Sequence, residues 1–162
     1  MADTTVSAAM ASDHREIDEG FTQFREGLSL GERRREPLAR AAAALRRHIY
    51  LEEEILFPPL GEAGLAPPVA VMFEEHGAIW GTLDDITRCL DEESDVTSIQ
   101  QAYDSLVGIL GEHNRKEEGI LYPAADRLLD STVSSQVLEF LDRGVPPADW
   151  ICGNLRRAGN AK

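Results

Sequence analysis

Apolar residues recur at helical spacing along most of the chain. Ile17, Phe21, Phe24 and Leu28 follow one another at intervals of four, three and four residues, which places them on one face of a helix. Alternating apolar and polar runs rich in Val, Ile and Thr, which are typical of strands, are nearly absent. The pattern therefore predicts an all-α protein.

Glycine, proline and serine mark the ends of these helical patterns, at 29–31, 61–68, 94–95 and 144–147. We expect helices over about 6–28, from near Pro37 to Pro58, from beside Pro68 to about 92, from after Thr97 to Tyr122 or beyond, and over about 132–142. Pro37 suits a first helical turn, and the Thr97 hydroxyl can cap the fourth helix. Four long helices joined by short loops predict an up-down-up-down antiparallel four-helix bundle with an additional short C-terminal helix. We expect one domain over 1–162, with the core bundle at about 6–128, a C-terminal helix and tail over 129–162, and a frayed end over 154–162.

Composition narrows the class of protein. A chain of 162 residues with 43% hydrophobic residues can bury one core. Its formal charge of −13 disfavours nucleic acids and anionic membrane surfaces, which bind through phosphate groups. There is no apolar run of membrane-spanning length and no basic segment before an apolar stretch, and the two cysteines, Cys89 and Cys152, form no CxxC pair. We expect no membrane span, no secretory signal, no disulfide framework and a cytoplasmic location.

The chain contains an internal repeat. The pattern His-x3-Glu-Glu-x-Ile-Leu-aromatic-Pro occurs at 48–58 and again at 113–123, an offset of 65 residues. A shorter pattern, an acidic residue followed by His-x-x-Ile, occurs at 13–17 and again at 75–79, an offset of 62 residues. The chain is thus two helical hairpins of one pattern, and each hairpin has one single histidine and one His-x3-Glu pair.

The repeated residues have the chemistry of metal ligands. Residues four apart lie on one face of a helix, so each His-x3-Glu pair can present an imidazole and a carboxylate to the same point. In an antiparallel bundle six side chains can converge, and they include every histidine of the protein: His14, His48, Glu52, His76, His113 and Glu117. Buried groups of this kind need partners, and a metal supplies them. Nitrogen and carboxylate donors without sulfur suit iron, manganese or zinc, and one carboxylate from each hairpin can bridge two ions.

Other polar residues near the repeat have simpler interpretations. Glu53 and Glu118 point about 100° away from the preceding glutamate. We expect each of them either to be solvated or to contact a metal-binding side chain without binding the metal itself. Tyr50 and Tyr122 could reach a metal, but packing is the favoured role. Asp18, four residues after His14, is a weaker candidate for an additional ligand.

The doubled motif resembles the hemerythrin-like, or HHE cation-binding, family, over about 13–128. The resemblance implies an up-down four-helix bundle with a non-haem di-iron centre: four terminal histidine ligands, bridging Glu52 and Glu117, and an oxo or hydroxo bridge. Oxygen-carrying hemerythrins have a second histidine four residues after the one on the third helix, where this chain has Trp80. They also use an aspartate five residues after the last histidine, where this chain has Glu118. Four histidines and two glutamates are more similar to hemerythrin-like domains of iron-centre repair, nitric-oxide response and iron or oxygen sensing.

The leading hypothesis is a di-iron protein that binds or senses a small oxidant, O2, nitric oxide or peroxide, at an open iron position. Redox turnover at the same centre, such as nitric oxide or peroxide reduction, is one alternative, and iron storage or donation is another. A zinc hydrolase is the weakest, because the HExxH motif is missing.

Overall fold

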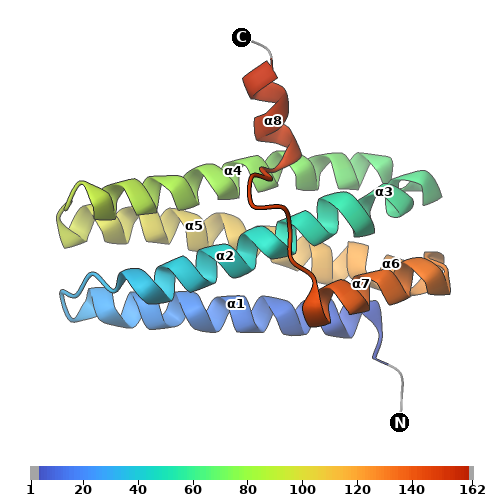
Figure 1. The fold of residues 1–162 in the computed structure, drawn as a ribbon, viewed down its shortest axis with the longest axis horizontal. Coiled ribbons are helices and arrows are strands. Elements are labelled where there is room, and N and C mark those ends of the chain that lie inside the picture. Colours follow the sequence, from blue (N-terminus) through green and yellow to red (C-terminus); the bar gives the residue numbers. More distant parts are fainter. Residues whose placement is uncertain (1–3, 161–162) are drawn as a thin grey trace.

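The computed structural model describes residues 4–160, and four long helices dominate it (Figure 1). These are α1 (Val6–Ser29), α2 (Arg35–Leu51), α4 (Ala66–Asp91) and α5 (Val96–Lys116). Helix α1 packs against α2 and α5, and α4 packs against α5 and α2, so the four helices form a closed ring around one interior. No strand occurs in residues 4–160, which confirms the prediction of an all-α helical bundle.

Two of the long helices continue through a wider turn. After α2 come the π-helical segment η1 (Glu52–Leu56) and α3 (Phe57–Leu60), and after α5 come η3 (Glu117–Leu121) and α6 (Tyr122–Leu128). The prediction that the second helix stops at Pro58 is therefore wrong. A proline clashes with the carbonyl four residues earlier in a regular α-helix, whereas a π turn displaces that carbonyl. Both copies of the repeat have a π turn before the proline, and both π turns begin at the glutamate of the His-x3-Glu pair.

The ends of the helices require two further corrections. The fourth helix is capped by Asp95, not Thr97: the Asp95 carboxylate accepts a hydrogen bond of 2.7 Å from the Ser98 backbone N–H, and its extended backbone suits this position. The helix expected over 132–142 is α7 (Ser131–Arg143). The tail expected to fray instead forms α8 (Gly153–Asn160), which packs on α4; residues 161–162 lie outside the described part of the chain.

The turn between α3 and α4 depends on one glycine. Segment η2 (Gly61–Leu65) contains Gly64 with φ of 107°, a conformation that favours glycine. The helical stretch Arg35–Asp91 is long and apolar enough to span a membrane by length and composition alone. It reverses direction at this turn, however, and α2 and α4 are separate rods in Figure 1 rather than one straight helix.

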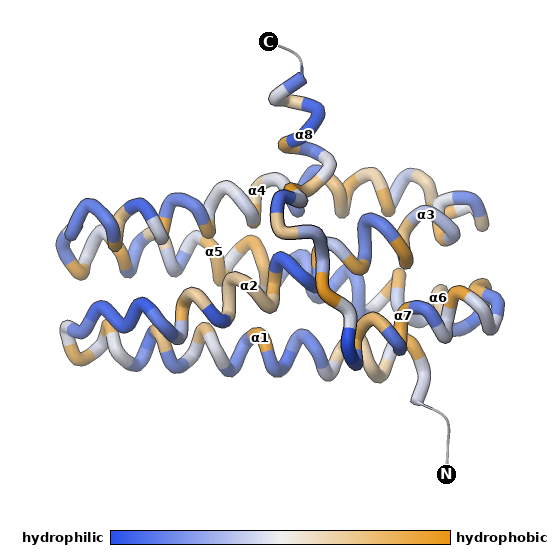
Figure 2. The backbone as a smooth tube through the Cα atoms, in the orientation of Figure 1, coloured by the Kyte–Doolittle hydropathy of each residue, from blue (hydrophilic) through white to orange (hydrophobic). Residues whose placement is uncertain are grey.

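The interior has two apolar layers with a polar layer between them. Each long helix alternates hydrophobic and hydrophilic segments every few residues (Figure 2). On α1, Met10 belongs to one buried apolar cluster and Ile17 to the other, and on α4 Met72 and Ile79 are divided in the same way. A histidine lies between the two members of each pair. His48 likewise lies between Leu45 and Leu51, and His113 between Leu110 of α5 and Leu121 beyond its end, which places four histidines at one level of the bundle.

Candidate metal centre

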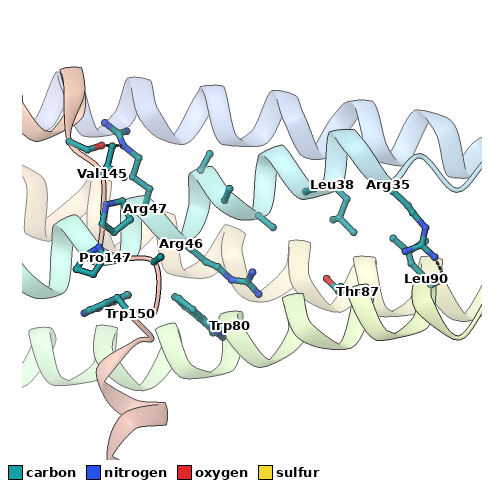
Figure 3. A pocket seen from close by; sticks show the side chains of 17 residues that line it. Arg35, Leu38, Arg46, Arg47, Trp80, Thr87, Leu90, Val145, Pro147 and Trp150 are labelled. Atoms are coloured by element: carbon teal, nitrogen blue, oxygen red, sulfur yellow. Dashed lines mark hydrogen bonds between the residues drawn. The ribbon is translucent and has the colours of Figure 1, made fainter.

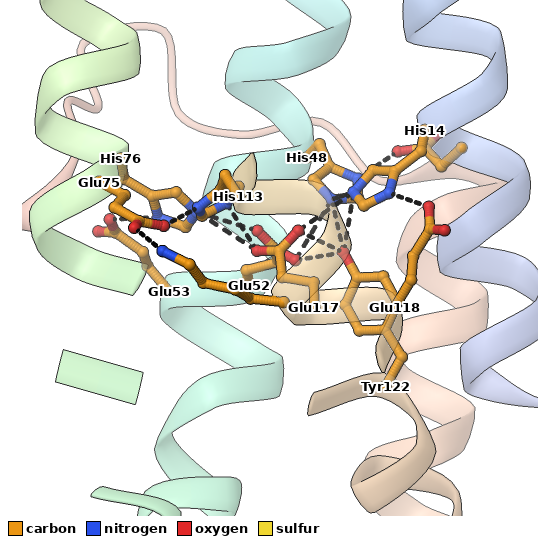
Figure 4. Close-up of polar contacts among 12 residues, drawn as sticks. His14, His48, Glu52, Glu53, Glu75, His76, His113, Glu117, Glu118 and Tyr122 are labelled. Carbon is orange, nitrogen blue, oxygen red and sulfur yellow. Dashed lines mark hydrogen bonds and ion pairs between the residues drawn. The ribbon is translucent and has the colours of Figure 1, made fainter. Parts of the chain in front are cut away.

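The six residues predicted as ligands come together inside the bundle (Figure 4). Each long helix provides one histidine, and the first residue of each π turn provides one glutamate. All six side chains are buried, with exposed fractions of 3% or less: His14, His48, Glu52, His76, His113 and Glu117. The hairpin repeat thus produces a buried polar cluster to which each hairpin contributes two histidines and one glutamate.

The cluster divides into two groups of four ligands, and the two glutamates belong to both. Glu52 directs Oε1 to His48 Nε2, at 3.3 Å, and Oε2 to His76 Nε2, at 3.1 Å. Glu117 directs Oε2 to His14 Nε2, at 3.3 Å, and Oε1 to His113 Nε2, at 2.7 Å. Each carboxylate therefore directs one oxygen to each group of histidines.

Carboxylates outside the cluster orient all four imidazoles. His14 Nδ1 lies 2.8 Å from Glu118, and His48 Nδ1 lies 2.7 Å from Asp13. The second hairpin repeats the pattern, with 2.9 Å from His76 Nδ1 to Glu53 and 2.8 Å from His113 Nδ1 to Glu75. Since each Nδ1–H donates to a carboxylate, each Nε2 lone pair is directed into the cluster, which is the usual arrangement of histidines that bind metals.

Sequence reasoning found only part of this outer layer. Glu53 and Glu118 were expected to be solvated or to contact a ligand from outside, and both contact a histidine. Glu53 is buried, with 4% exposed, whereas Glu118 is 46% exposed. The sequence prediction assigns no contact to Asp13 and Glu75, although each directly precedes a histidine in the repeated acidic-His match.

Three buried atoms in the cluster lack hydrogen bonds: Glu52 Oε2, His76 Nε2 and Glu117 Oε1. Glu52 Oε2 nevertheless lies 3.1 Å from His76 Nε2, and Glu117 Oε1 lies 2.7 Å from His113 Nε2, so ligand atoms converge here without hydrogen bonds of good geometry. All three belong to the group formed with His113, and nitrogen and carboxylate donors without sulfur suit a non-haem metal ion. The residues present therefore fit a bound cation.

The metal-free cluster has strong affinity for protons. Burial opposes the charged form of His48, but Glu52 and Asp13 outweigh burial and raise its pKa to about 10. Burial likewise opposes ionisation of Glu117, but His113, His14 and His76 hold its pKa well below the usual range. Without metal, a protonated His48 pairs with ionised carboxylates, and metal ions must displace such protons to bind.

Tyr122 also belongs to the cluster, although packing was its favoured role. Its side chain is fully buried, and its hydroxyl donates to Glu52 Oε1 at 2.6 Å. Burial and the charges of Glu117 and Glu52 raise the pKa of Tyr122 well above its usual range. The sequence feature that distinguishes Tyr122 is its place in the repeat: the second hairpin has a hydroxyl-bearing residue where the first hairpin has Phe57.

The tail after α7 connects to this layer through Glu53. Glu53 Oε2 accepts a hydrogen bond of 2.7 Å from the Gly153 backbone N–H, at the start of α8. The neighbouring Glu54 accepts from Trp150 Nε1 at 2.9 Å and from Arg156 at 3.2 Å. The side chain that holds His76 is thus itself held by the C-terminal segment.

The remaining candidates lie away from the cluster. Trp80, four residues after His76, lines a cavity of about 790 Å³ between α2 and α4 and packs against Trp150 (Figure 3). Tyr50 packs against Phe140 and Trp150. Asp18 is exposed and is not in either group of ligands. None of the three contributes to the candidate metal centre.

Comparison with known families agrees with this geometry. Residues 5–125 match the family model described as the hemerythrin HHE cation binding domain, which covers the four long helices and all six converging residues. No curated protein and no solved structure matched the chain.

Proposed function

The chain belongs to the hemerythrin HHE cation-binding domain family, and from this premise we propose that it is a non-haem di-iron protein that binds or senses a small oxidant: O2, nitric oxide or peroxide. Two groups of ligands that share two carboxylates support a pair of ions rather than one. Histidine and carboxylate ligands without cysteine suit iron as well as manganese or zinc, and the resemblance to hemerythrins favours iron.

The observation that carries the proposal is the burial of the cluster. Glu52, His76 and Glu117 have exposed fractions of 0%, and the other three converging residues do not exceed 3%. The two largest cavities described, of about 790 and 1130 Å³, are lined by none of the six. A buried centre of this kind suits a reactant of two to four atoms, whereas a larger substrate needs a cleft that opens on the ligands.

The residues of the chain have defined roles in this function. Iron, when bound, supplies redox chemistry and coordination positions that a small oxidant can take. The four imidazoles would hold the ions through Nε2, and Glu53, Glu75, Asp13 and Glu118 fix the orientation of the imidazoles. The apolar layers on either side keep bulk water out, which strengthens the electrostatic interactions between ligands and ions.

Anaerobic reconstitution with ferrous iron tests the proposal. We expect two irons per chain by elemental analysis, and a change in the optical spectrum after rapid mixing with at least one of O2, nitric oxide and hydrogen peroxide. Glu117→Ala should lose iron and stability together, because binding to the folded state stabilises it. Asp18→Asn, a change of an exposed carboxylate on the same helix as His14, is the control and should keep both irons.

Three results would contradict the proposal: one zinc per chain in protein purified with its native metal, full iron occupancy in Glu117→Ala, or no spectral change with any of the three oxidants. Sustained consumption of the oxidant in the presence of a reductant would favour an enzyme over a sensor. A single stoichiometric reaction would favour binding.

A further inference from the structure

Tyr122 has a position that packing does not explain. Its hydroxyl oxygen lies within hydrogen-bonding distance of four atoms of one ligand group: Glu52 Oε1 at 2.6 Å, His14 Nε2 at 3.0 Å, and His48 Nε2 and Glu117 Oε2 at 3.1 Å each. Figure 4 shows the phenol directed from α6 into the cluster. The hydroxyl thus contacts the whole ligand set of one half of the centre.

Hydrogen bonding alone cannot satisfy these contacts in the form of the site that binds metal. The imidazoles must be neutral to bind a metal, and their Nδ1–H groups already donate to Glu118 and Asp13. His14 Nε2, His48 Nε2 and both carboxylates are then acceptors only. A phenol has one proton, so at most one of the four short contacts is a hydrogen bond and three bring two acceptors together. A cation bound by all five atoms removes that conflict.

The distances also have the pattern of ligands around one octahedral ion. Adjacent ligands at about 2.1 Å from such an ion are about 3.0 Å apart. The four distances from the hydroxyl span 2.6 to 3.1 Å. Along the ligand set, His14 Nε2 lies 3.1 Å from His48 Nε2 and 3.3 Å from Glu117 Oε2. The hydroxyl therefore lies at ligand-to-ligand distance from all four atoms of this group, as a fifth ligand of the same ion would.

The other half of the centre has no equivalent hydroxyl. The repeat places Phe57 where the second hairpin has Tyr122, and the Phe57 ring stacks on His76 with ring centroids 5.8 Å apart and an interplanar angle of 14°. The group that includes His76 and His113 thus has four protein ligands, and it contains all three of the buried atoms without hydrogen bonds.

We propose that Tyr122 is a fifth protein ligand, bound as phenolate to the ion held by His14 and His48, and that the ion held by His76 and His113 is the one with positions open to a small oxidant. On binding, the phenol exchanges its proton for the ion, and the proton leaves to solvent. The second half of this inference rests on the proposed function; the first half requires only that iron binds.

Optical and resonance Raman spectroscopy of the ferric protein, loaded with two irons and without added oxidant ligand, tests the tyrosine. Iron(III) bound by phenolate has a strong charge-transfer band in the visible range, and excitation in that band enhances phenolate ring vibrations. We expect both signals in the wild-type protein and their loss in Tyr122→Phe. Tyr50→Phe and Tyr103→Phe change the other two tyrosines and are the matched controls; both should keep the band.

Phe57→Tyr supplies the complementary variant. It adds a hydroxyl at the position related by the repeat, so a second phenolate contribution should appear in the Raman spectrum, and the spectral response to a small oxidant should weaken as the open position is filled. The assignment of the open position is overturned if Phe57→Tyr gains the band and keeps the full response.

The outcomes separate this inference from the proposed function. Wild-type protein with two ferric irons and no phenolate band overturns the role of Tyr122 and leaves the di-iron function intact, and so does a band that persists in Tyr122→Phe. Failure to bind two irons overturns the proposed function itself. Because the wild-type spectrum is decisive, the test does not depend on the folding of any variant.

Discussion

The buried carboxylate of Glu53 offers the sharpest test of how the centre is held. Its two oxygens have different partners: Oε1 accepts from His76 Nδ1 at 2.9 Å, and Oε2 accepts from the Gly153 backbone N–H at 2.7 Å. Only 4% of the residue is exposed, so water cannot replace either partner. Glu53→Gln preserves the shape of the side chain but changes one acceptor oxygen into an NH2 donor. One of the two buried N–H groups must then lose its acceptor.

The expected magnitude follows from these contacts. A buried donor without an acceptor costs about 1–3 kcal/mol, and the remaining hydrogen bond loses its charge assistance. We therefore expect the metal-free Glu53→Gln protein to lose about 2–3 kcal/mol of unfolding free energy. Loss of the carboxylate that orients a metal-binding histidine typically lowers metal affinity about 10–100-fold. The weakened ion should be the one held by His76.

Glu118→Gln is the matched control. Glu118 contacts His14 Nδ1 at 2.8 Å, but it is 46% exposed, so water can replace its oxygen. We expect a loss of less than about 1 kcal/mol in this variant, as for other exposed pairs. Urea unfolding followed by circular dichroism measures stability, and anaerobic titration with ferrous iron measures affinity. Equal losses in the two variants, or an unchanged Glu53→Gln protein, would refute the reasoning.

Three further predictions concern the pH dependence of stability, the backbone at two glycines and the C-terminal segment. The pKa of His48 is raised from 6.5 to about 10, so its protonation stabilises the metal-free protein fully below pH 6.5, and this stabilisation is lost as the pH rises through 10. Urea unfolding across this pH range should show the decline. Iron affinity should rise over the same range, because the protons that compete with iron leave. Gly64→Ala should cost about 1–2 kcal/mol because φ is 107°, whereas Gly111→Ala, in α5 with open space around it, should gain about 0.4–1 kcal/mol in thermal unfolding. Trp150→Ala removes the hydrogen bond to Glu54 and two aromatic contacts, and should cost about 2 kcal/mol by urea unfolding.

Much of the fold was predictable because its signals are local. Helical spacing of apolar residues and the breaks between them predicted the long helices close to their observed ends: about 6–28 corresponds to Val6–Ser29, and about 132–142 to Ser131–Arg143. The errors arose where one local rule competed with another. Proline usually ends a helix because its ring clashes with the carbonyl four residues earlier. The π turn before Pro58 relieves this clash, and no residue preference in the sequence predicts that turn.

The sequence by itself determined which six residues can meet, because a repeated His-x3-Glu pair on amphipathic helices has only one buried face on which to place them. Tertiary structure decided what surrounds them. The contacts of Asp13 with His48 and of Glu75 with His113 join different helices, and the bond from Glu53 to Gly153 spans 100 positions. Such partners depend on the packing distance and rotation of neighbouring helices, which helical periodicity does not specify. The assignment of Tyr122 depends on both the sequence and the tertiary structure. The repeat aligns it with Phe57, and only the folded bundle shows that its hydroxyl is directed at four ligand atoms.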